Sequence, residues 1–148
     1  MSNIDAVKPQ AGPVVGVVIV THGLLATELL NAAETIVGDL PGFTAVSIGW
    51  HDDVPVATAA MSRAIARVDT GAGVLLLTDM FGGTPSNLAM TFLEADSIEV
   101  VTGVNLPMLI KLARAAATGN VLAAARAIAN DGRQAIRVAS DLLRGTGS

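Results

Sequence analysis

The sequence predicts an α/β protein with an open, doubly wound, mainly parallel four-stranded sheet and helices on both faces. Two uninterrupted apolar runs, at 14–20 and 74–78, consist almost entirely of Val, Ile and Leu, as in strands that are buried on both sides. Segments with helical spacing of apolar residues follow the predicted strands. A chain that alternates strands and helices in this order forms a parallel sheet through crossover connections.

The first half of the chain is expected to contain two strand–helix units. These are a strand at 14–20, a helix from Leu25 to Ile36, a strand at 44–48 and a helix at 54–68. Gly38 is the expected end of the first helix, because glycine readily adopts the backbone conformation that follows a helix. Asp53 is the expected N-cap of the second helix.

The second half of the chain continues the same alternation. The expected elements are a strand at 74–78, a helix to about 94, a strand at 98–102, a helix to about 117 and a helix at 121–129. Thr84 followed by Pro85 predicts a helix start, with the threonine as cap and the proline where no N–H is needed. The sequence Asn130-Asp131-Gly132 predicts a break, and the tail from Gln134 to Leu143 fits both a strand and a helix.

Composition limits the classes of protein and partner. The 148 residues are 51% hydrophobic but only 3% aromatic, so a single domain with a core of Val, Leu, Ile and Ala is expected. The net charge of −4 argues against nucleic acid and anionic membranes as partners, because both favour a basic face. The absence of cysteine excludes disulfides and thiolate chemistry and agrees with a reducing compartment.

Residues 1–13 are expected to be a flexible lead-in, and residues 14–148 to form the one domain. The lead-in lacks the basic and apolar regions of a signal peptide. Charges and glycines interrupt the later apolar runs before they reach the length of a membrane span. We therefore expect a soluble, cytoplasmic protein without membrane insertion.

Three predicted strands end in a polar residue that precedes a turn and a helix start. These residues are His22, Asp79 and Asn105. The carboxyl ends of parallel strands share one edge of a sheet, where ligands of α/β proteins bind, so the three loops are expected to open onto the same edge. His51, in the polar loop after the second strand, is interpreted as a solvated residue, the alternative being that it lines the cleft.

His22 is the candidate nucleophile and Asp79 the candidate residue that orients it. Taken singly, a histidine at this place can be an ordinary loop residue, and a carboxylate can simply cap a turn. Taken together, a carboxylate that accepts the Nδ1–H bond fixes the imidazole tautomer and leaves Nε2 free to attack. The same carboxylate stabilises the imidazolium that then forms.

Gly82, Gly83 and Thr84 form a candidate phosphate-binding turn. Two glycines allow close approach of the backbone to an anion, N–H groups hold its oxygens, and the Thr84 hydroxyl adds a donor. A tight turn with a cap would also explain these residues. Neither GxxxxGK[ST] nor GxGxxG is present, and two differently placed histidines make a poor metal site. The combination predicts phosphoryl transfer through a phosphohistidine, without metal or cofactor.

Three motifs carry a resemblance to a known family: Thr21-His22-Gly23, then DMFGGTPSN from Asp79, then GVNLPML from Gly103. In this order and spacing, they make the chain similar to the enzyme IIA domain of the mannose-family sugar phosphotransferase system, from about Val14 onward. Phe81 stands where some members carry a larger aromatic residue, and the lead-in is extra.

The resemblance implies a phosphocarrier role in sugar uptake. The histidine phosphocarrier protein would phosphorylate His22 at Nε2, and an enzyme IIB would receive the group on a histidine or cysteine. Asp79 matches the partner carboxylate and Thr84 the hydroxyl residue at the phosphate, while Thr21, Phe81 and Asn105 are expected to line the site. No IIB sequence follows, so the acceptor is expected on a separate chain.

The resemblance also implies a homodimer. In this family a C-terminal strand is exchanged between subunits and lies antiparallel to the others. For this chain that would end a helix at Gly132 and make 135–140 the exchanged strand.

Two alternative functions share the same phosphorylation site. One is a regulatory switch whose phosphorylated His22 changes binding to a regulator or enzyme, without a transporter. The other is the phosphoryl-donor domain of a dihydroxyacetone kinase system, which the segments at 82–85 and 105–107 fit less well. Neighbouring genes for the membrane IIC and IID components would favour transport over regulation.

Overall fold

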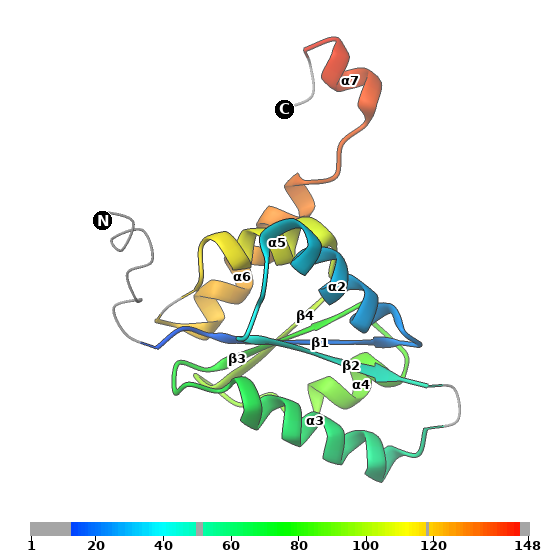
Figure 1. The fold of residues 1–148 in the computed structure, drawn as a ribbon, viewed down its shortest axis with the longest axis vertical. Coiled ribbons are helices and arrows are strands. Elements are labelled where there is room, and N and C mark those ends of the chain that lie inside the picture. The colour runs from blue at the N-terminus through cyan, green and yellow to red at the C-terminus, as the bar shows by residue number, and fades with distance from the viewer. Residues whose placement is uncertain (1–12, 50–51, 118, 146–148) are drawn as a thin grey trace.

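The computed structural model describes residues 13–49, 52–117 and 119–145 and has a four-stranded, entirely parallel sheet in the order β2-β1-β3-β4. The strands are β1 (Gly16–His22), β2 (Phe43–Ile48), β3 (Val74–Thr78) and β4 (Ile98–Thr102). The helices are α2 (Leu25–Val37), α3 (Val54–Val68), α4 (Thr84–Met90), α5 (Leu106–Arg114), α6 (Val121–Gln134) and α7 (Ala139–Leu143). Helices α2, α5 and α6 cover one face and α3 and α4 the other (Figure 1), which confirms the predicted fold class.

Alternate side chains of the central strands fill two cores. Val17 and Ile19 of β1 pack toward α2, α5 and α6, whereas Val18 and Val20 pack toward α3 and α4. All four side chains are at most 2% exposed. Burial of such a side chain contributes about 1.5–3 kcal/mol, so β1, which ends in His22, is anchored from both faces.

Two predicted helix boundaries are confirmed. Gly38 follows α2 with a φ of 91°, a conformation that favours glycine. Asp53 precedes α3, and its Oδ1 accepts a hydrogen bond from the Val56 N–H at 3.2 Å.

The prediction for the third helix was wrong at both ends. Gly83, not Thr84, is the N-cap of α4, and no side chain caps it; Thr84 is already the first helical residue. The helix ends at Met90 rather than near Glu94. After Met90 the backbone hydrogen bonds span three residues instead of four, since the Phe92 N–H donates to the Ala89 carbonyl. The Thr91 hydroxyl donates to the Leu88 carbonyl. Helix α5 also ends earlier than predicted, at Arg114 rather than about residue 117.

The predicted break at 130–132 was also wrong, because α6 continues to Gln134. Gly132 serves close packing here instead of ending the helix. A Cβ atom at Gly132 would lie 2.6 Å from Sδ of Met108 in α5, so a larger residue here would force the Met108 side chain to move.

The tail after α6 contains no strand within the described residues of the single chain. Residues 136–138 lead to the short helix α7, and this segment projects away from the body (Figure 1). Ile136 and Val138 are 77% and 63% exposed. An exchanged strand needs a second subunit, so it stays a prediction. In the part of the chain that the structure describes, no helix has the length and apolarity needed to span a bilayer.

Candidate active site

The register of the sheet brings His22 and Asp79 together. Val20 of β1 pairs with Thr78 of β3 in parallel, so both strands deliver the chain to the same edge. His22 is the last residue of β1, and Asp79 is the first residue after β3. The predicted convergence of these two residues is therefore found.

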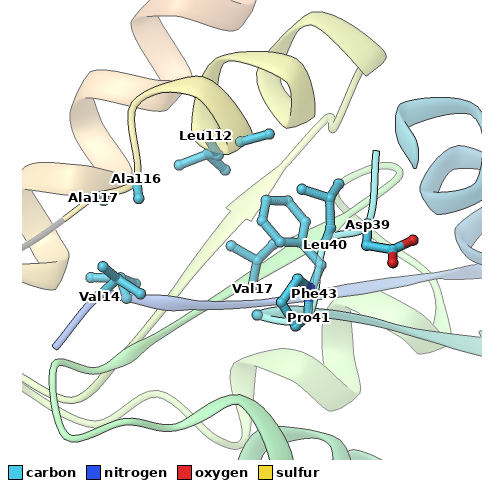
Figure 2. Close-up of a pocket in the computed structure, with 12 residues that line it drawn as sticks. Val14, Val17, Asp39, Leu40, Pro41, Phe43, Leu112, Ala116 and Ala117 are labelled. Atoms are coloured by element: carbon cyan, nitrogen blue, oxygen red, sulfur yellow. The ribbon is translucent and has the colours of Figure 1, made fainter. Parts of the chain in front are cut away.

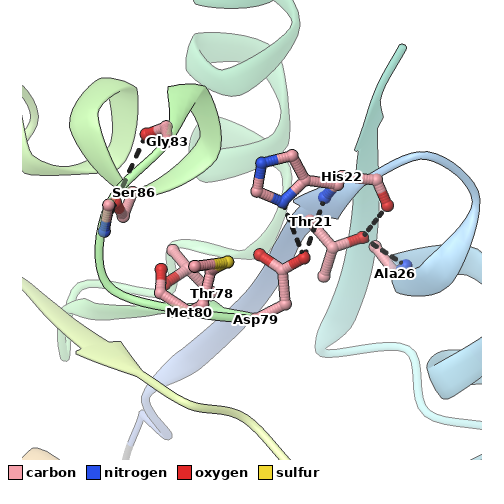
Figure 3. Close-up of polar contacts among 9 residues, drawn as sticks. Thr21, His22, Ala26, Thr78, Asp79, Met80, Gly83 and Ser86 are labelled. Carbon is pink, nitrogen blue, oxygen red and sulfur yellow. Dashed lines mark hydrogen bonds and ion pairs between the residues drawn. The ribbon is translucent and has the colours of Figure 1, made fainter. Parts of the chain in front are cut away.

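One carboxylate oxygen of Asp79 holds both the ring and the backbone of His22. Oδ2 lies 2.9 Å from Nδ1 and accepts the backbone N–H of His22 at 3.2 Å (Figure 3). A carboxylate accepts but does not donate, so this contact places a proton on Nδ1 and leaves the lone pair of Nε2 free. The His22 side chain is 51% exposed and that of Asp79 only 14%. The free nitrogen is thus accessible, while its partner is shielded.

The environment keeps Asp79 ionised. Burial raises its pKa, but the hydrogen bonds from the ring and backbone of His22 and the electrostatic attraction of that residue lower it more, so that the pKa of this carboxyl lies below its ordinary value. Its second oxygen, Oδ1, is buried and has no hydrogen-bond partner among the described residues. Within the described chain, His22 is therefore the neighbour that stabilises this carboxylate.

The loop before α4 lies directly against Nε2. A Cβ atom at Gly83 would be 2.9 Å from Nε2 of His22, and the φ angles of Gly82 and Gly83 are 98° and 93°. Glycine is needed at Gly83 for both reasons. The Gly82 N–H donates to Oγ of Ser86 at 2.8 Å, whereas the N–H groups of Gly83 and Thr84 have no acceptor among the described residues.

These residues border a hollow of 470 Å³ at the carboxyl edge of the sheet. We call it the His22 hollow; it is lined by His22, Gly23, Ile48, Gly49, Gly83, Thr84 and Pro85. Within the described ranges its lining has no lysine or arginine, and no three histidine or acidic side chains gather as metal ligands would. Backbone N–H groups and the Thr84 hydroxyl are the donors that the hollow offers to an anion.

A second hollow, of 230 Å³, lies at the opposite end of β1 (Figure 2). Its lining combines Val14, Val17, Leu40, Phe43 and Leu112 with a single charged residue, Asp39. Apart from Asp39, the side chains that line this second hollow are apolar.

The other predicted site residues fall outside the His22 hollow. Thr21 is fully buried, and its hydroxyl accepts the Ala26 N–H at 2.6 Å and donates to the His22 carbonyl at 3.1 Å. It therefore holds the junction of β1 and α2 and does not line the site. Phe81 is 72% exposed and also lies outside the lining. His51 is outside the described residues.

Asn105, which was expected to line the site, is not among the residues that line the His22 hollow. Its Oδ1 accepts the Met108 N–H at 3.1 Å and its Nδ2 donates to the Gly132 carbonyl at 3.2 Å. The amide is thus used to cap α5 and to tie it to α6. Asn105 follows β4, which β3 separates from β1.

Sequence reasoning missed Ser86, whose hydroxyl braces the glycine loop. The signal was present, since a polar residue at the third position of a helix often bonds back to the N–H groups before it.

A family model described as "EIIA-man: PTS system fructose IIA component" matches residues 16–129. The match contains both His22 and Asp79. It covers all four strands and ends within α6.

Two relatives that are components of PTS systems support the same family. The chain is 37% identical over 103 residues to the PTS system mannose-specific EIIAB component of Escherichia coli strain K12, covering 66% of this chain and 30% of that protein. It thus spans less than a third of the length of this relative. It is also 33% identical over 98 residues to the PTS system sorbose-specific EIIA component of Lacticaseibacillus casei, covering 66% of this chain and 70% of that one.

Solved structures show the same fold. The mannose/sorbose-specific IIA subunit from Enterococcus faecalis superposes with a TM-score of 0.72 at 29% identity, covering 84% of this chain and 93% of its own. The PTS IIA protein associated with the fucose utilization operon of Streptococcus pneumoniae gives a TM-score of 0.77 at 24% identity, covering 90% and 99%.

Proposed function

The chain belongs to the EIIA-man family of phosphotransferase-system IIA components, and we propose that its His22 carries a phosphoryl group from the histidine phosphocarrier protein to an enzyme IIB during sugar uptake. The observation that carries this proposal is the contact between Asp79 Oδ2 and His22 Nδ1 at 2.9 Å. It leaves Nε2 unprotonated and open to the His22 hollow, as a nucleophile requires.

The transfer exchanges one phosphorus–nitrogen bond for another. The lone pair of Nε2 attacks the phosphorus of the donor's phosphohistidine, a P–N bond forms at Nε2, and the donor's P–N bond breaks as its imidazole leaves. His22 keeps the proton on Nδ1, so its ring becomes positively charged. Asp79 stabilises this charge, and attack by the IIB nucleophile then reverses the step and restores neutral His22.

The loop next to Nε2 supplies hydrogen-bond donors to the phosphoryl oxygens in this proposal. The free N–H groups of Gly83 and Thr84 and the Thr84 hydroxyl lie where the hollow borders Nε2. Gly82 contributes its backbone conformation, since its own N–H is used by Ser86.

Exposed apolar residues at the same edge support docking of protein partners. Leu24 directly follows the His22-Gly23 pair, and Met80 and Phe81 directly follow Asp79; they are 70%, 54% and 72% exposed. A small-molecule site would bury such residues, whereas a surface that meets two protein partners in turn leaves them accessible. We propose that this edge receives the phosphocarrier protein and the IIB component, the latter on a separate chain, in the cytoplasm.

A homodimer with an exchanged strand is part of the proposal. β4 is an edge strand that pairs only with β3 among the described strands, and the exposed Ile136 and Val138 alternate in the tail. An open edge and an uncovered apolar segment suit pairing with a second copy.

Incubation with phosphoenolpyruvate, enzyme I and the phosphocarrier protein tests the function. We expect the wild type to gain one acid-labile phosphate, and His22→Ala to gain none while keeping its circular dichroism spectrum. Equal loading of His22→Ala would overturn the assignment of the carrier residue.

A further inference from the structure

We propose that Ser86 is a positioning residue that sets the Gly82–Gly83 loop against Nε2 of His22 and so controls the rate of phosphoryl transfer. This inference rests on the proposed function for its catalytic consequence. Its structural part, the bracing of the loop by Ser86, stands on contacts alone.

Ser86 is a fully buried hydroxyl with two backbone partners, both in the loop. Its Oγ accepts the Gly82 N–H at 2.8 Å and donates to the Gly83 carbonyl at 3.3 Å (Figure 3 shows the second bond). The hydroxyl thus uses its only proton and one of its two lone pairs on the two residues before α4. Neither of these bonds involves His22.

The loop needs this restraint because its two glycines do not by themselves favour one backbone conformation. Gly82 and Gly83 both have φ values above 90°, and glycine has more conformational freedom than any other residue when it is not restrained. The N-cap position is Gly83, which has no side chain with which to cap the helix. Ser86, at the third helical position, therefore restrains the loop by bonding the N–H of Gly82 and the carbonyl of Gly83.

The position of this loop matters because it borders the reacting nitrogen. The Cβ position of Gly83 is 2.9 Å from Nε2, so a small shift of the loop either blocks the nitrogen or withdraws the N–H groups beside it. Displacements of about 1 Å can cost up to about 100-fold in rate. Asp79 fixes the other side of the ring, through Nδ1. Asp79 therefore holds the ring on its Nδ1 side, and Ser86 positions the glycine loop that borders Nε2.

The test compares Ser86→Ala with Thr91→Ala, and with Ser86→Thr as a hydroxyl-retaining variant. Thr91 is a matched control, since its hydroxyl donates to the Leu88 carbonyl at 2.6 Å at the far end of the same helix. We expect Ser86→Ala to load phosphate about 10-fold more slowly at saturating phosphocarrier, with an unchanged KM for it. Thr91→Ala should load normally, and Ser86→Thr should recover part of the rate.

Hydrogen exchange of the Gly82 amide gives a readout that does not depend on phosphorylation. We expect exchange at Gly82 to quicken about 10-fold or more in Ser86→Ala but not in Thr91→Ala. An unchanged Gly82 exchange rate or a wild-type loading rate in Ser86→Ala would overturn the inference. If the wild type takes up no phosphate, the proposed function fails, whereas the exchange data still decide whether Ser86 braces the loop.

Discussion

Asp79 and His22 are joined at two points by a single oxygen: Oδ2 lies 2.9 Å from Nδ1 of the ring and 3.2 Å from the backbone nitrogen of the same residue. This double contact fixes the tautomer of the ring and also the end of the strand that carries it. The chemistry of His22 and the local order of β1 therefore depend on the same carboxylate.

The variant Asp79→Asn tests the electrostatic part of this contact. The amide oxygen of the new side chain can still accept the Nδ1–H bond, but it no longer offsets the positive charge of a phosphorylated ring. A hydrogen bond to a charged group is worth about 1.5–3 kcal/mol, so we expect loading to slow about 10- to 100-fold. Initial rates of phosphate incorporation measure this. Asp69→Asn is the control, because Asp69 accepts the Gly71 N–H at the opposite edge of the sheet; an equal loss in both variants would contradict the role of Asp79.

The depressed pKa of Asp79 predicts how stability depends on pH. A carboxyl whose pKa is lower in the folded than in the unfolded chain stabilises the fold above its unfolded value, here near 3.8, and loses this contribution as pH falls through the folded value. We expect the wild type to lose more free energy of unfolding than Asp79→Asn between about pH 5 and about pH 2. Urea unfolding at several pH values tests this, and parallel curves for the two proteins would contradict it.

Gly83→Ala is expected to block loading more severely than its loss of stability explains. The new Cβ atom would lie 2.9 Å from Nε2, in the place that the phosphoryl group must approach. Gly103→Ala is the matched control, since Gly103 has a similar φ of 95° but open space around it. Both variants carry a backbone strain of about 1–3 kcal/mol. Only Gly83→Ala should lower the loading rate, by about 100-fold or more; comparable loading in the two folded variants would contradict this.

The exposed apolar residues beside the site should affect partner binding rather than chemistry. Phe81 is 72% exposed and makes no lining contact with the His22 hollow. We expect Phe81→Ser to raise the KM for the phosphocarrier protein about 5- to 10-fold and to leave the maximal rate nearly unchanged, because truncation of one interface aromatic commonly costs about 1–2 kcal/mol. Val56→Ser, at a position on α3 that is 61% exposed, tests how far this surface extends. A fall in the maximal rate with unchanged KM in Phe81→Ser would contradict a docking role.

The sequence was sufficient for the sheet and for the central pair, but not for helix ends and loop contacts. The apolar runs and the order of the strands predict that His22 and Asp79 lie at one edge, because the carboxyl ends of neighbouring parallel strands meet at the same edge of a sheet. Gly132 lies inside α6, although its sequence context predicts a break, because sequence alone does not distinguish a glycine that ends a helix from one that lets Met108 pack closely. Asn105 follows a strand, as predicted, but its side-chain amide bonds to Met108 in α5 and Gly132 in α6. The contact with α6 depends on how the two helices pack, which the sequence around Asn105 does not indicate.

The apolar residues of the tail are exposed in the single chain, and this exposure predicts that a second subunit buries them. Ile136 and Val138 are 77% and 63% exposed and alternate as one face of a strand does, and the edge strand β4 of the sheet is open among the described strands. We expect the wild type to be a dimer by light scattering, and Ile136→Ser with Val138→Ser to shift it toward the monomer and to lower its unfolding midpoint. Leu122→Ser, at a partly exposed position on α6, is the control and should leave the dimer intact. A wild type that is monomeric at high micromolar concentration would contradict the exchanged strand without affecting the assignment of His22, because the contacts with Asp79 that orient the ring come from within one chain.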